Sequence, residues 1–185
     1  MSQTDKLIIN AAVTGTVLYK SDTPCLPTSL AEIVEDARRV REAGASVIHL
    51  HARAPDQSPS YDPAVYTELV DRVRDATDLI VNVSLSGRFV QDVQTRAAPL
   101  AAQPELASLT LGSMNFISGA SVNAPDTVRE LAARIHAVGA VPELEIFEAG
   151  LKDLELGDGP GGMDPRRQLS KGVGSVDAGS GHEIQ

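Results

Sequence analysis

The chain has 185 residues, of which 42% are hydrophobic and 22% are charged, a composition typical of one folded globular domain. Its formal net charge of −9 argues against nucleic acid or an anionic membrane surface as the main partner, because both attract positively charged proteins. Cys25 is the only cysteine, so no internal disulfide can form, and the sequence shows neither a signal peptide nor a membrane span. We therefore expect a cytoplasmic protein.

The first predicted elements are a strand and a helix. Residues 7–13 form an apolar run that predicts a buried strand, and a polar loop follows. Ser29 and Glu32 have the spacing of a capping box, in which each side chain satisfies a free backbone N–H of the first helical turn. Apolar residues recur at helical spacing from there, and Gly44 is expected to end the helix.

The alternation of strand and helix continues along the chain at roughly 33-residue spacing, which predicts right-handed βαβ units and a parallel sheet. In order, we expect a strand ending near His51, a helix capped by Asp62, a strand at 79–86, a weaker helical segment at 88–103 broken by Pro99, a strand at 106–112, a loop, a helix from about 123–126 to Gly139, and a strand at 141–147. This makes five strands and four helices.

The segment after Gly150 differs in composition. Eight of the 15 glycines lie between 157 and 181, and no run there has helical or strand periodicity. We therefore expect residues 151–185 to be a glycine-rich, mostly irregular tail. Five strands suffice for an open sheet, whereas a closed barrel needs eight.

His49 and His51 lie two residues apart in the second predicted strand. Side chains alternate between the faces of a strand, so these two point the same way, about 7 Å apart along the strand. That places them within reach of one shared metal ion. Two hydrogen-bonded core histidines would fit the same pattern.

Polar residues gather at the ends of the following strands. They are Ser84 and Ser86 on the third strand, Ser108 and Thr110 on the fourth, and Glu143 and Glu145 on the fifth. Because ligands bind at the carboxyl ends of parallel strands, four successive strands are expected to contribute to one site.

These residues resemble the β-keto acid cleavage enzyme family, best known from 3-keto-5-aminohexanoate cleavage enzyme. The resemblance covers roughly residues 6–150, in family order and spacing. It is carried by Thr14-Gly15, Leu26-Pro27, Ala43-Gly44-Ala45, the run His49-Leu50-His51-Ala52-Arg53, Arg96, Gly112-Ser113-Met114-Asn115-Phe116, and Pro142-Glu143-Leu144-Glu145-Ile146-Phe147. The set is specific, whereas the histidine pair alone occurs in other metal barrels.

The resemblance implies a (β/α)₈ TIM barrel, with residues 1–150 forming a partial barrel of about five strands and four helices. It also implies a zinc-dependent, coenzyme A-dependent retro-Claisen exchange, in which a β-keto acid and acetyl-CoA give acetoacetate and a new acyl-CoA. The implied roles are His49 and His51 as zinc ligands, Glu145 as a residue of the catalytic network, and Ser84 and Ser108 as catalytic residues that bind substrate oxygens. From its position in the sequence, Arg53 is expected to bind the substrate by balancing anionic charge nearby. From the residues alone, Arg53 and Arg96 are expected to form structural ion pairs.

Two departures from the family pattern affect these expectations. The family's third metal ligand, a glutamate, belongs to a late barrel strand that is not recognisable here, although Pro160-Gly161-Gly162-Met163 resembles a loop after a later strand. Zinc affinity is therefore expected to fall below that of a complete site. Val17 stands where the amino-substrate enzyme has a glutamate, which favours a neutral or apolar β-keto acid over a cationic one.

Two other functions fit parts of the pattern. A metal-dependent hydrolase of the amidohydrolase kind also uses a His-X-His pair, but the pair normally ends the first strand and later histidines complete that site. A truncated, non-catalytic barrel is the other alternative, and for a chain of this length we favour inactivity over turnover. The expected partners are a small β-keto acid and acetyl-CoA, without nucleic acid or membrane, and a homo-oligomer is expected.

Overall fold

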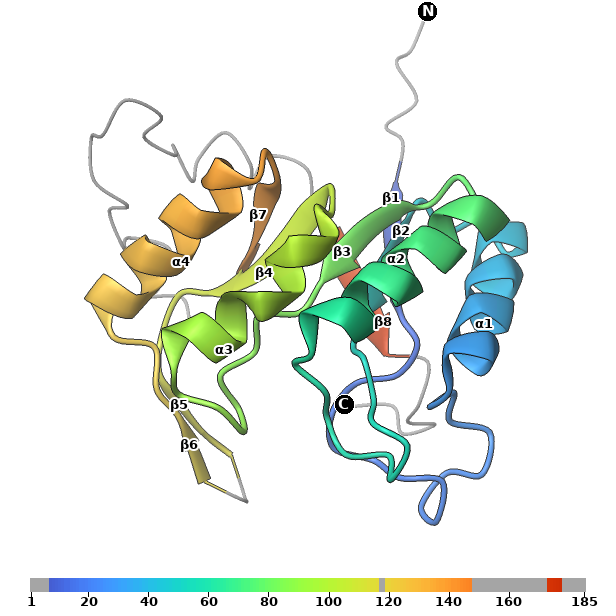
Figure 1. The fold of residues 1–185 in the computed structure, drawn as a ribbon, viewed down its shortest axis with the longest axis horizontal. Helices are drawn as coiled ribbons and strands as arrows, with labels where there is room; N and C mark the ends of the chain where they lie inside the picture. The colour runs from blue at the N-terminus through green and yellow to red at the C-terminus, as the bar shows by residue number, and fades with distance from the viewer. Residues whose placement is uncertain (1–6, 117–118, 148–172, 178–185) are drawn as a thin grey trace, which may run out of the picture.

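The computed structural model describes residues 7–116, 119–147 and 173–177, and its main feature is a six-stranded sheet (Figure 1). The order of strands is β7-β4-β3-β2-β1-β8, and every pairing in it is parallel. The strands are β1 (Ile8–Ala12), β2 (Val47–Leu50), β3 (Ile80–Val83), β4 (Leu106–Thr110), β7 (Val141–Glu145) and β8 (Val173–Asp177). The strands β1, β2, β3, β4 and β7 therefore lie side by side in the order in which they occur along the chain, and β8 is added at the other edge, next to β1.

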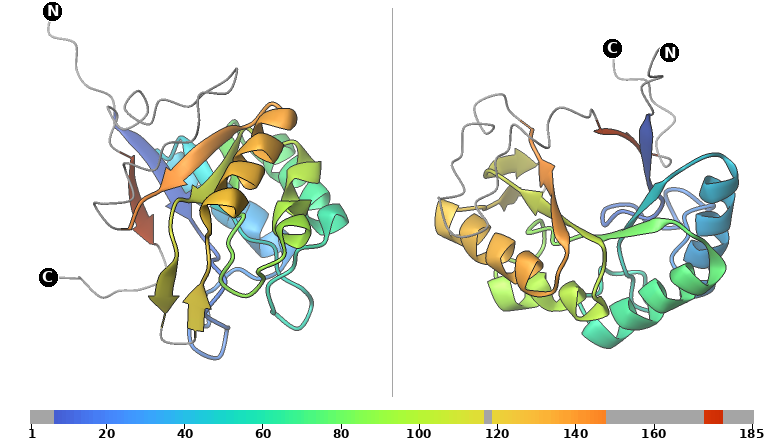
Figure 2. Two further views of the ribbon diagram at one scale, coloured as in Figure 1. Left: turned by 90° about the vertical axis from the view of Figure 1, so that its left-hand side faces the viewer. Right: turned by 90° about the horizontal axis from the view of Figure 1, so that it is seen from above.

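The helices cover one face of this curved sheet. They are α1 (Leu30–Glu42), α2 (Pro63–Ala76), α3 (Val93–Ala97) with the following 3₁₀ turn η1 (Ala98–Ala102), and α4 (Pro125–Ala137). Seen from above, they form an arc around the convex side of the sheet, and the strands line the concave side (Figure 2). A short antiparallel hairpin, β5 (Met114–Phe116) and β6 (Gly119–Ser121), extends from the end of β4.

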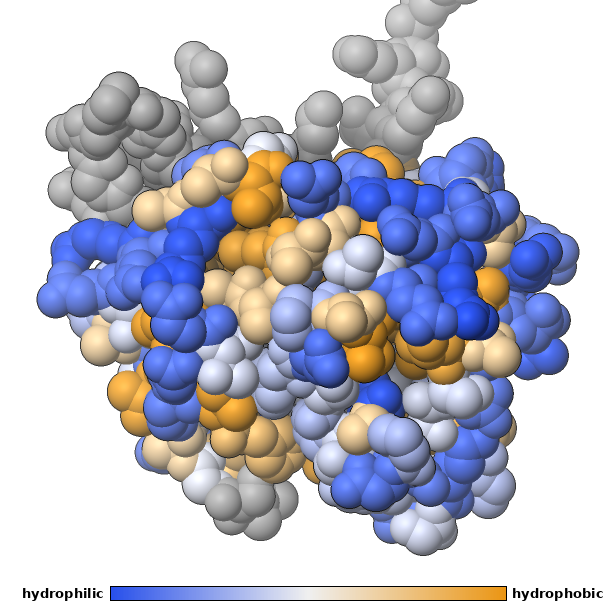
Figure 3. All heavy atoms as spheres, viewed as in Figure 1, coloured by the Kyte–Doolittle hydropathy of each residue, from blue (hydrophilic) through white to orange (hydrophobic). Residues whose placement is uncertain are grey.

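The hydrophobic core lies between the helices and the convex face. Ile33 of α1, Leu69 of α2 and Leu131 of α4 are fully buried there, against buried strand residues such as Ile48 and Val81. The outward surfaces of α1, α2 and α4 are largely hydrophilic (Figure 3). Within the described residues, no helix is long and apolar enough to cross a membrane.

The predicted capping box of α1 is confirmed. The Ser29 hydroxyl accepts a hydrogen bond from the Glu32 N–H (3.3 Å), and the Glu32 carboxylate accepts from the Ser29 N–H (3.0 Å) and the Thr28 N–H (3.1 Å). The Lys20 ammonium also donates to this carboxylate. Bonding to Lys20, and then to the two backbone N–H groups, lowers the pKa of Glu32 from 4.5 to about 2.

We expect Glu32→Gln to lower the free energy of unfolding at pH 7 by about 1 kcal/mol or less. The substitution removes the negative charge that faces Lys20 and two backbone N–H groups, but a glutamine oxygen can still accept from the Ser29 N–H, and the Glu32 side chain is 43% exposed and screened. A lowered folded-state pKa stabilises the fold above pH 4.5, and that contribution is lost as the pH falls from 4.5 through about 2. Urea unfolding at pH 7, 4 and 2.5 should therefore show the difference between the two proteins shrinking, with only a minor part left at pH 2.5. Glu35→Gln on the exposed face of the same helix is the control, and a difference that is undiminished at pH 2.5 would contradict the assignment.

The expected fold of five strands and four helices is confirmed, with three local differences. The helical segment expected at 88–103 is shorter, because α3 begins only at Val93, after the N-cap Asp92, and becomes a 3₁₀ turn at Pro99. The loop expected after the fourth strand contains the β5–β6 hairpin. Part of the tail expected to be irregular forms β8, which pairs with β1, whereas Pro160-Gly161-Gly162-Met163 lies outside the described residues.

Candidate active site

A cavity of about 270 Å³ opens at the carboxyl ends of the strands. Its walls come from the loop after β1, the ends of β2, β3, β4 and β7, and the β5–β6 hairpin. Parallel strands bring their ends together at one edge of a sheet, so residues far apart in the sequence meet here. The cavity lies where the sequence predicts the site, at the carboxyl ends of the parallel strands.

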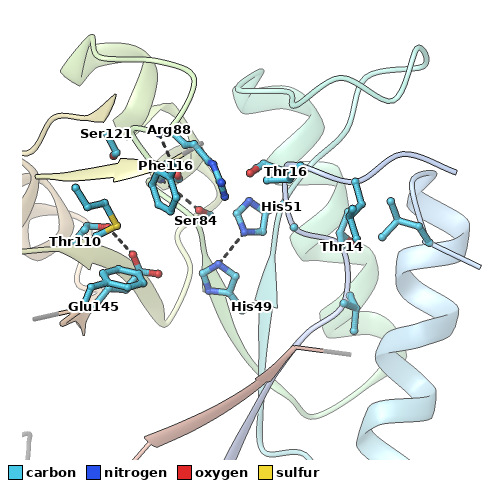
Figure 4. Close-up of a pocket in the computed structure, with 18 residues that line it drawn as sticks. Thr14, Thr16, His49, His51, Ser84, Arg88, Thr110, Phe116, Ser121 and Glu145 are labelled. Carbon is cyan, nitrogen blue, oxygen red and sulfur yellow. Dashed lines mark hydrogen bonds between the residues drawn. The ribbon is translucent and has the colours of Figure 1, made fainter. Parts of the chain in front are cut away.

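His49 and His51 both line the cavity, and their rings face each other (Figure 4). The two Nε2 atoms are 3.0 Å apart, and the ring centroids are 4.8 Å apart. Two nitrogens bound at 2.0–2.1 Å to a tetrahedral zinc ion are separated by about 3.3 Å, so the observed separation fits a shared ion. The expectation that the two side chains point together into one cavity is confirmed.

The protonation of His51 suits a metal ligand. Burial, followed by the nearby charges of His49 and Arg53, lowers the pKa of His51 well below 6.5. The ring is therefore neutral at pH 7, and a neutral imidazole is the form that binds a metal.

Glu143 lies beside His49, a contact that sequence reasoning did not assign. Its carboxylate is 3.7 Å from the Nδ1 atom of His49 and accepts hydrogen bonds from the side-chain amides of Asn10 (2.6 Å) and Asn82. Burial favours a higher pKa for Glu143, but the hydrogen bond and charge of His49, with the two amides, outweigh burial and lower it. An ionised carboxylate behind a ring nitrogen is the usual partner of a metal-binding histidine. The sequence signal was the alternation that puts Glu143 and Glu145 on one face of β7.

Glu145 lies in the wall opposite the histidines (Figure 4). The hydroxyl of Thr110 donates a 2.5 Å hydrogen bond to its carboxylate, and Thr110 itself lines the cavity. Ser84 also lines the cavity. Three side chains, one directly after β3 and one each on β4 and β7, thus present oxygen atoms to one space.

Ser108 is buried deeper than its neighbours at the site. It shares a face of β4 with Thr110 but precedes it by two residues, so it does not belong to the described cavity lining. Its hydroxyl accepts a hydrogen bond from the Leu85 N–H (3.3 Å). In this structure Thr110, rather than Ser108, supplies the hydroxyl of β4 to the cavity.

Arg53 is buried and bonds to backbone carbonyls. Its guanidinium donates to the carbonyl oxygens of Gly15 (3.0 Å), Gln57 (2.6 Å) and Leu18 (3.1 Å). The ion pair expected for Arg53 is absent from the described residues, because these three carbonyls take its donors. Arg53 therefore fixes the loop after β1, whose residues, Val17 among them, line the cavity.

Arg88 is a cavity residue that sequence reasoning missed. Its guanidinium carbon lies 3.9 Å from the centre of the Phe116 ring, and both residues line the cavity. The arginine follows the polar end of β3, and that is the only signal the sequence offered for it.

The described residues contain no group of three or more His, Cys, Asp or Glu side chains placed to hold a metal ion. The histidine pair is thus a two-nitrogen platform that fits zinc in the spacing of its rings and in the lowered pKa of His51. A further ligand, from solvent, substrate or protein, would complete four-coordination.

Parallel strands in chain order, helices on the convex face and a polar cavity at the strand ends define this chain as part of a TIM-barrel protein. A protein family described as beta-keto acid cleavage enzyme matches residues 6–154. The chain therefore belongs to the β-keto acid cleavage enzyme family, and the resemblance noted from its motifs is confirmed.

Relatives and solved structures agree with this assignment. The chain is 36% identical over 149 residues to 3-oxoadipate:acetyl-CoA acetyltransferase from Cupriavidus necator, covering 80% of this chain and 52% of the relative. It is 32% identical over 154 residues to 3-keto-5-aminohexanoate cleavage enzyme from Fusobacterium nucleatum, covering 82% and 57%. The structure of the binary complex of ObcA with oxaloacetate matches 72% of this chain and 34% of that one, with a TM-score of 0.63 and 28% identity. The chain spans about half the length of the curated relatives it matches.

Proposed function

We propose that the chain carries the metal-binding half of a zinc-dependent, coenzyme A-dependent β-keto acid cleavage site. The observation that carries this proposal is the pair of histidine Nε2 atoms, 3.0 Å apart at the end of β2 and open to the cavity. Family membership supplies the reaction, and the named relatives support acyl exchange with acetyl-CoA.

His49 and His51 would hold the zinc ion through Nε2. With zinc on Nε2, the proton of the His49 ring would lie on Nδ1, which is 3.1 Å from the Asn82 amide nitrogen and 3.7 Å from the Glu143 carboxylate. Asn82 and Glu143 would together orient the ring so that Nε2 binds metal. When bound, zinc would act as a Lewis acid towards the keto and carboxylate oxygens of a β-keto acid.

The other polar groups would bind and orient the substrate. Ser84 and Thr110 present hydroxyl groups to the cavity, and Glu145 is held in place by Thr110. We propose Glu145 as a member of the catalytic network, as the family resemblance implies. Ser108 would act indirectly, because its hydroxyl holds the backbone N–H of Leu85, next to Ser84. Arg53 would also act indirectly, by holding the loop after β1.

In the exchange, the bond between the α-carbon and the keto carbon of the β-keto acid breaks, and the acyl group passes to coenzyme A. The acetyl group of acetyl-CoA joins the remaining two-carbon fragment to form acetoacetate. The substrates in the names of the relatives differ in the part beyond the keto group, which ends in a carboxylate in 3-oxoadipate and carries an amine on C5 in 3-keto-5-aminohexanoate. A cytoplasmic location and a homo-oligomer stay predictions.

The proposal is tested by mixing the chain with zinc, a β-keto acid and acetyl-CoA and measuring acetoacetate. We expect one zinc ion per chain, bound more weakly than at a three-histidine or two-histidine-carboxylate site. Turnover by this chain is expected to be slow or absent, and any acetoacetate formed should require all three components. Release of product without acetyl-CoA would instead support the hydrolase alternative. A chain that binds no zinc would contradict the proposal outright.

A further inference from the structure

Arg88 brings a positive charge into the cavity. It lies just after β3 on a segment that is anchored locally, because its own N–H donates to the Ser86 hydroxyl (3.2 Å). Its guanidinium stacks on Phe116 and points into the cavity between that ring and His51 (Figure 4). The ring holds the guanidinium in place, and the two Nη atoms at its outer end stay accessible to a ligand.

The donors of this guanidinium are not used by the described protein. Its two Nη atoms are not buried and form no hydrogen bond with the described residues, its Nε atom is buried without a partner, and no described carboxylate forms a salt bridge with it. Arg53, by contrast, bonds to three carbonyl oxygens, and Arg96 bonds to two protein oxygen atoms, although its Nη1 atom is also buried without a partner. The accessible Nη donors of a charged group that has no protein acceptor can therefore bind an acceptor from a ligand in the cavity.

The charges around the cavity select the sign of that ligand. Among the described lining residues, Arg88 is the one with a permanent positive charge, and the single carboxylate, Glu145, already accepts from Thr110. A carboxylate matches a guanidinium edge with two parallel hydrogen bonds. The apolar side chains of Val17, Met114 and Phe116 in the same lining suit a methylene chain.

We propose that Arg88 binds a second carboxylate, at the remote end of the acyl chain, so that the preferred substrate is a β-keto dicarboxylic acid. The inference rests on the proposed function, because it takes the histidine pair as the place where the keto acid end binds. Arg88 is then a specificity residue, because it increases the binding affinity only for acids with a remote carboxylate.

The test compares the binding of two acids of equal length, 3-oxoadipate and 3-oxohexanoate, which differ only in a carboxylate or a methyl group at the remote end. Isothermal titration of the full 185-residue chain with zinc present and acetyl-CoA absent measures binding without turnover. We expect the wild-type chain to bind 3-oxoadipate at least about tenfold more tightly. In Arg88→Gln that preference should disappear through weaker binding of 3-oxoadipate alone, and Arg88→Lys should keep part of it.

Arg39→Gln is the matched control, because Arg39 lies on the exposed surface in the last turn of α1, outside the cavity lining. It should leave both dissociation constants unchanged. Thermal unfolding of each variant shows whether the fold is intact.

Three results would overturn the inference. If Arg88→Gln weakens the binding of both acids equally, the arginine binds the carboxylate that both acids share. Unchanged acid binding with weaker binding of acetyl-CoA, but not of acetyl-pantetheine, would assign it to the phosphates of coenzyme A. Equal binding of both acids by the wild-type chain would remove Arg88 as a specificity residue while leaving the proposed function standing, whereas binding of neither acid would count against the proposed function itself.

Discussion

Arg96→Met is expected to lower the free energy of unfolding by about 3 kcal/mol, because it removes two hydrogen bonds from a charged donor inside the protein. Arg96 is 1% exposed, and its guanidinium donates to the Leu85 carbonyl (3.1 Å) and the Asn123 side-chain oxygen (2.8 Å). Asn123 in turn donates to the Gly112 carbonyl (3.0 Å). The substitution leaves two buried acceptors unpaired, and urea unfolding measures the loss.

Gly87 provides a sharper test of the position of the Arg96 guanidinium, which packs directly against it. A Cβ atom at this position would lie 2.8 Å from Nη1 of Arg96, which is too close for real atoms. Gly87→Ala should therefore cost about 1–3 kcal/mol in the wild-type chain, since the hydrogen-bonded guanidinium cannot easily move. In the Arg96→Met background the cost should fall below about 0.5 kcal/mol. An equal cost in both backgrounds would refute the contact, and the exposed Arg72→Met serves as control for loss of charge.

His51→Ala is expected to weaken zinc binding by more than about 100-fold, because it removes one of the two nitrogen ligands that the proposed site supplies. The same loss is expected for His49→Ala. Isothermal titration with zinc, or competition with a chromogenic chelator, measures the effect. His136→Ala is the control, because His136 lies on the exposed surface of α4.

Glu143→Gln tests the group behind the ligand. The substitution keeps the size of the side chain but removes the negative charge that faces Nδ1 of His49. Zinc affinity should fall by about 10- to 100-fold, less than on loss of a ligand.

For the two histidine variants, unchanged zinc binding in both His49→Ala and His51→Ala would place the metal elsewhere and remove the basis of the proposed function.

The parts of the fold that local chemistry determines could be predicted from the sequence. Ser29 and Glu32 satisfy the first turn of α1 within four residues, and this pattern is legible without any tertiary contact. The pairing of His49 with His51 follows from strand alternation alone. Both depend only on neighbours in the chain.

The features that depend on how far a side chain lies from the cavity, or on contacts with residues distant in the sequence, could not be predicted. Ser108 and Thr110 alternate identically, but only the position of β4 relative to its neighbours decides which hydroxyl reaches the cavity. The role of Glu143 depends on Asn10 and Asn82 from two other strands. The stacking of Arg88 depends on the β5–β6 hairpin, which no alternation in the sequence marked.

The pairing of β8 with β1 bears on the order in which the sheet assembles. Ile8 meets Val173, a separation of 165 residues, whereas β1 meets β2 across only 37, from Asn10 to Val47. For a flexible chain, closing the longer loop costs about 1.3 kcal/mol more in entropy. On a ribosome, the strands from β1 to β7 can therefore dock one after another as they emerge, and the edge strand is added last, to a sheet that already exists.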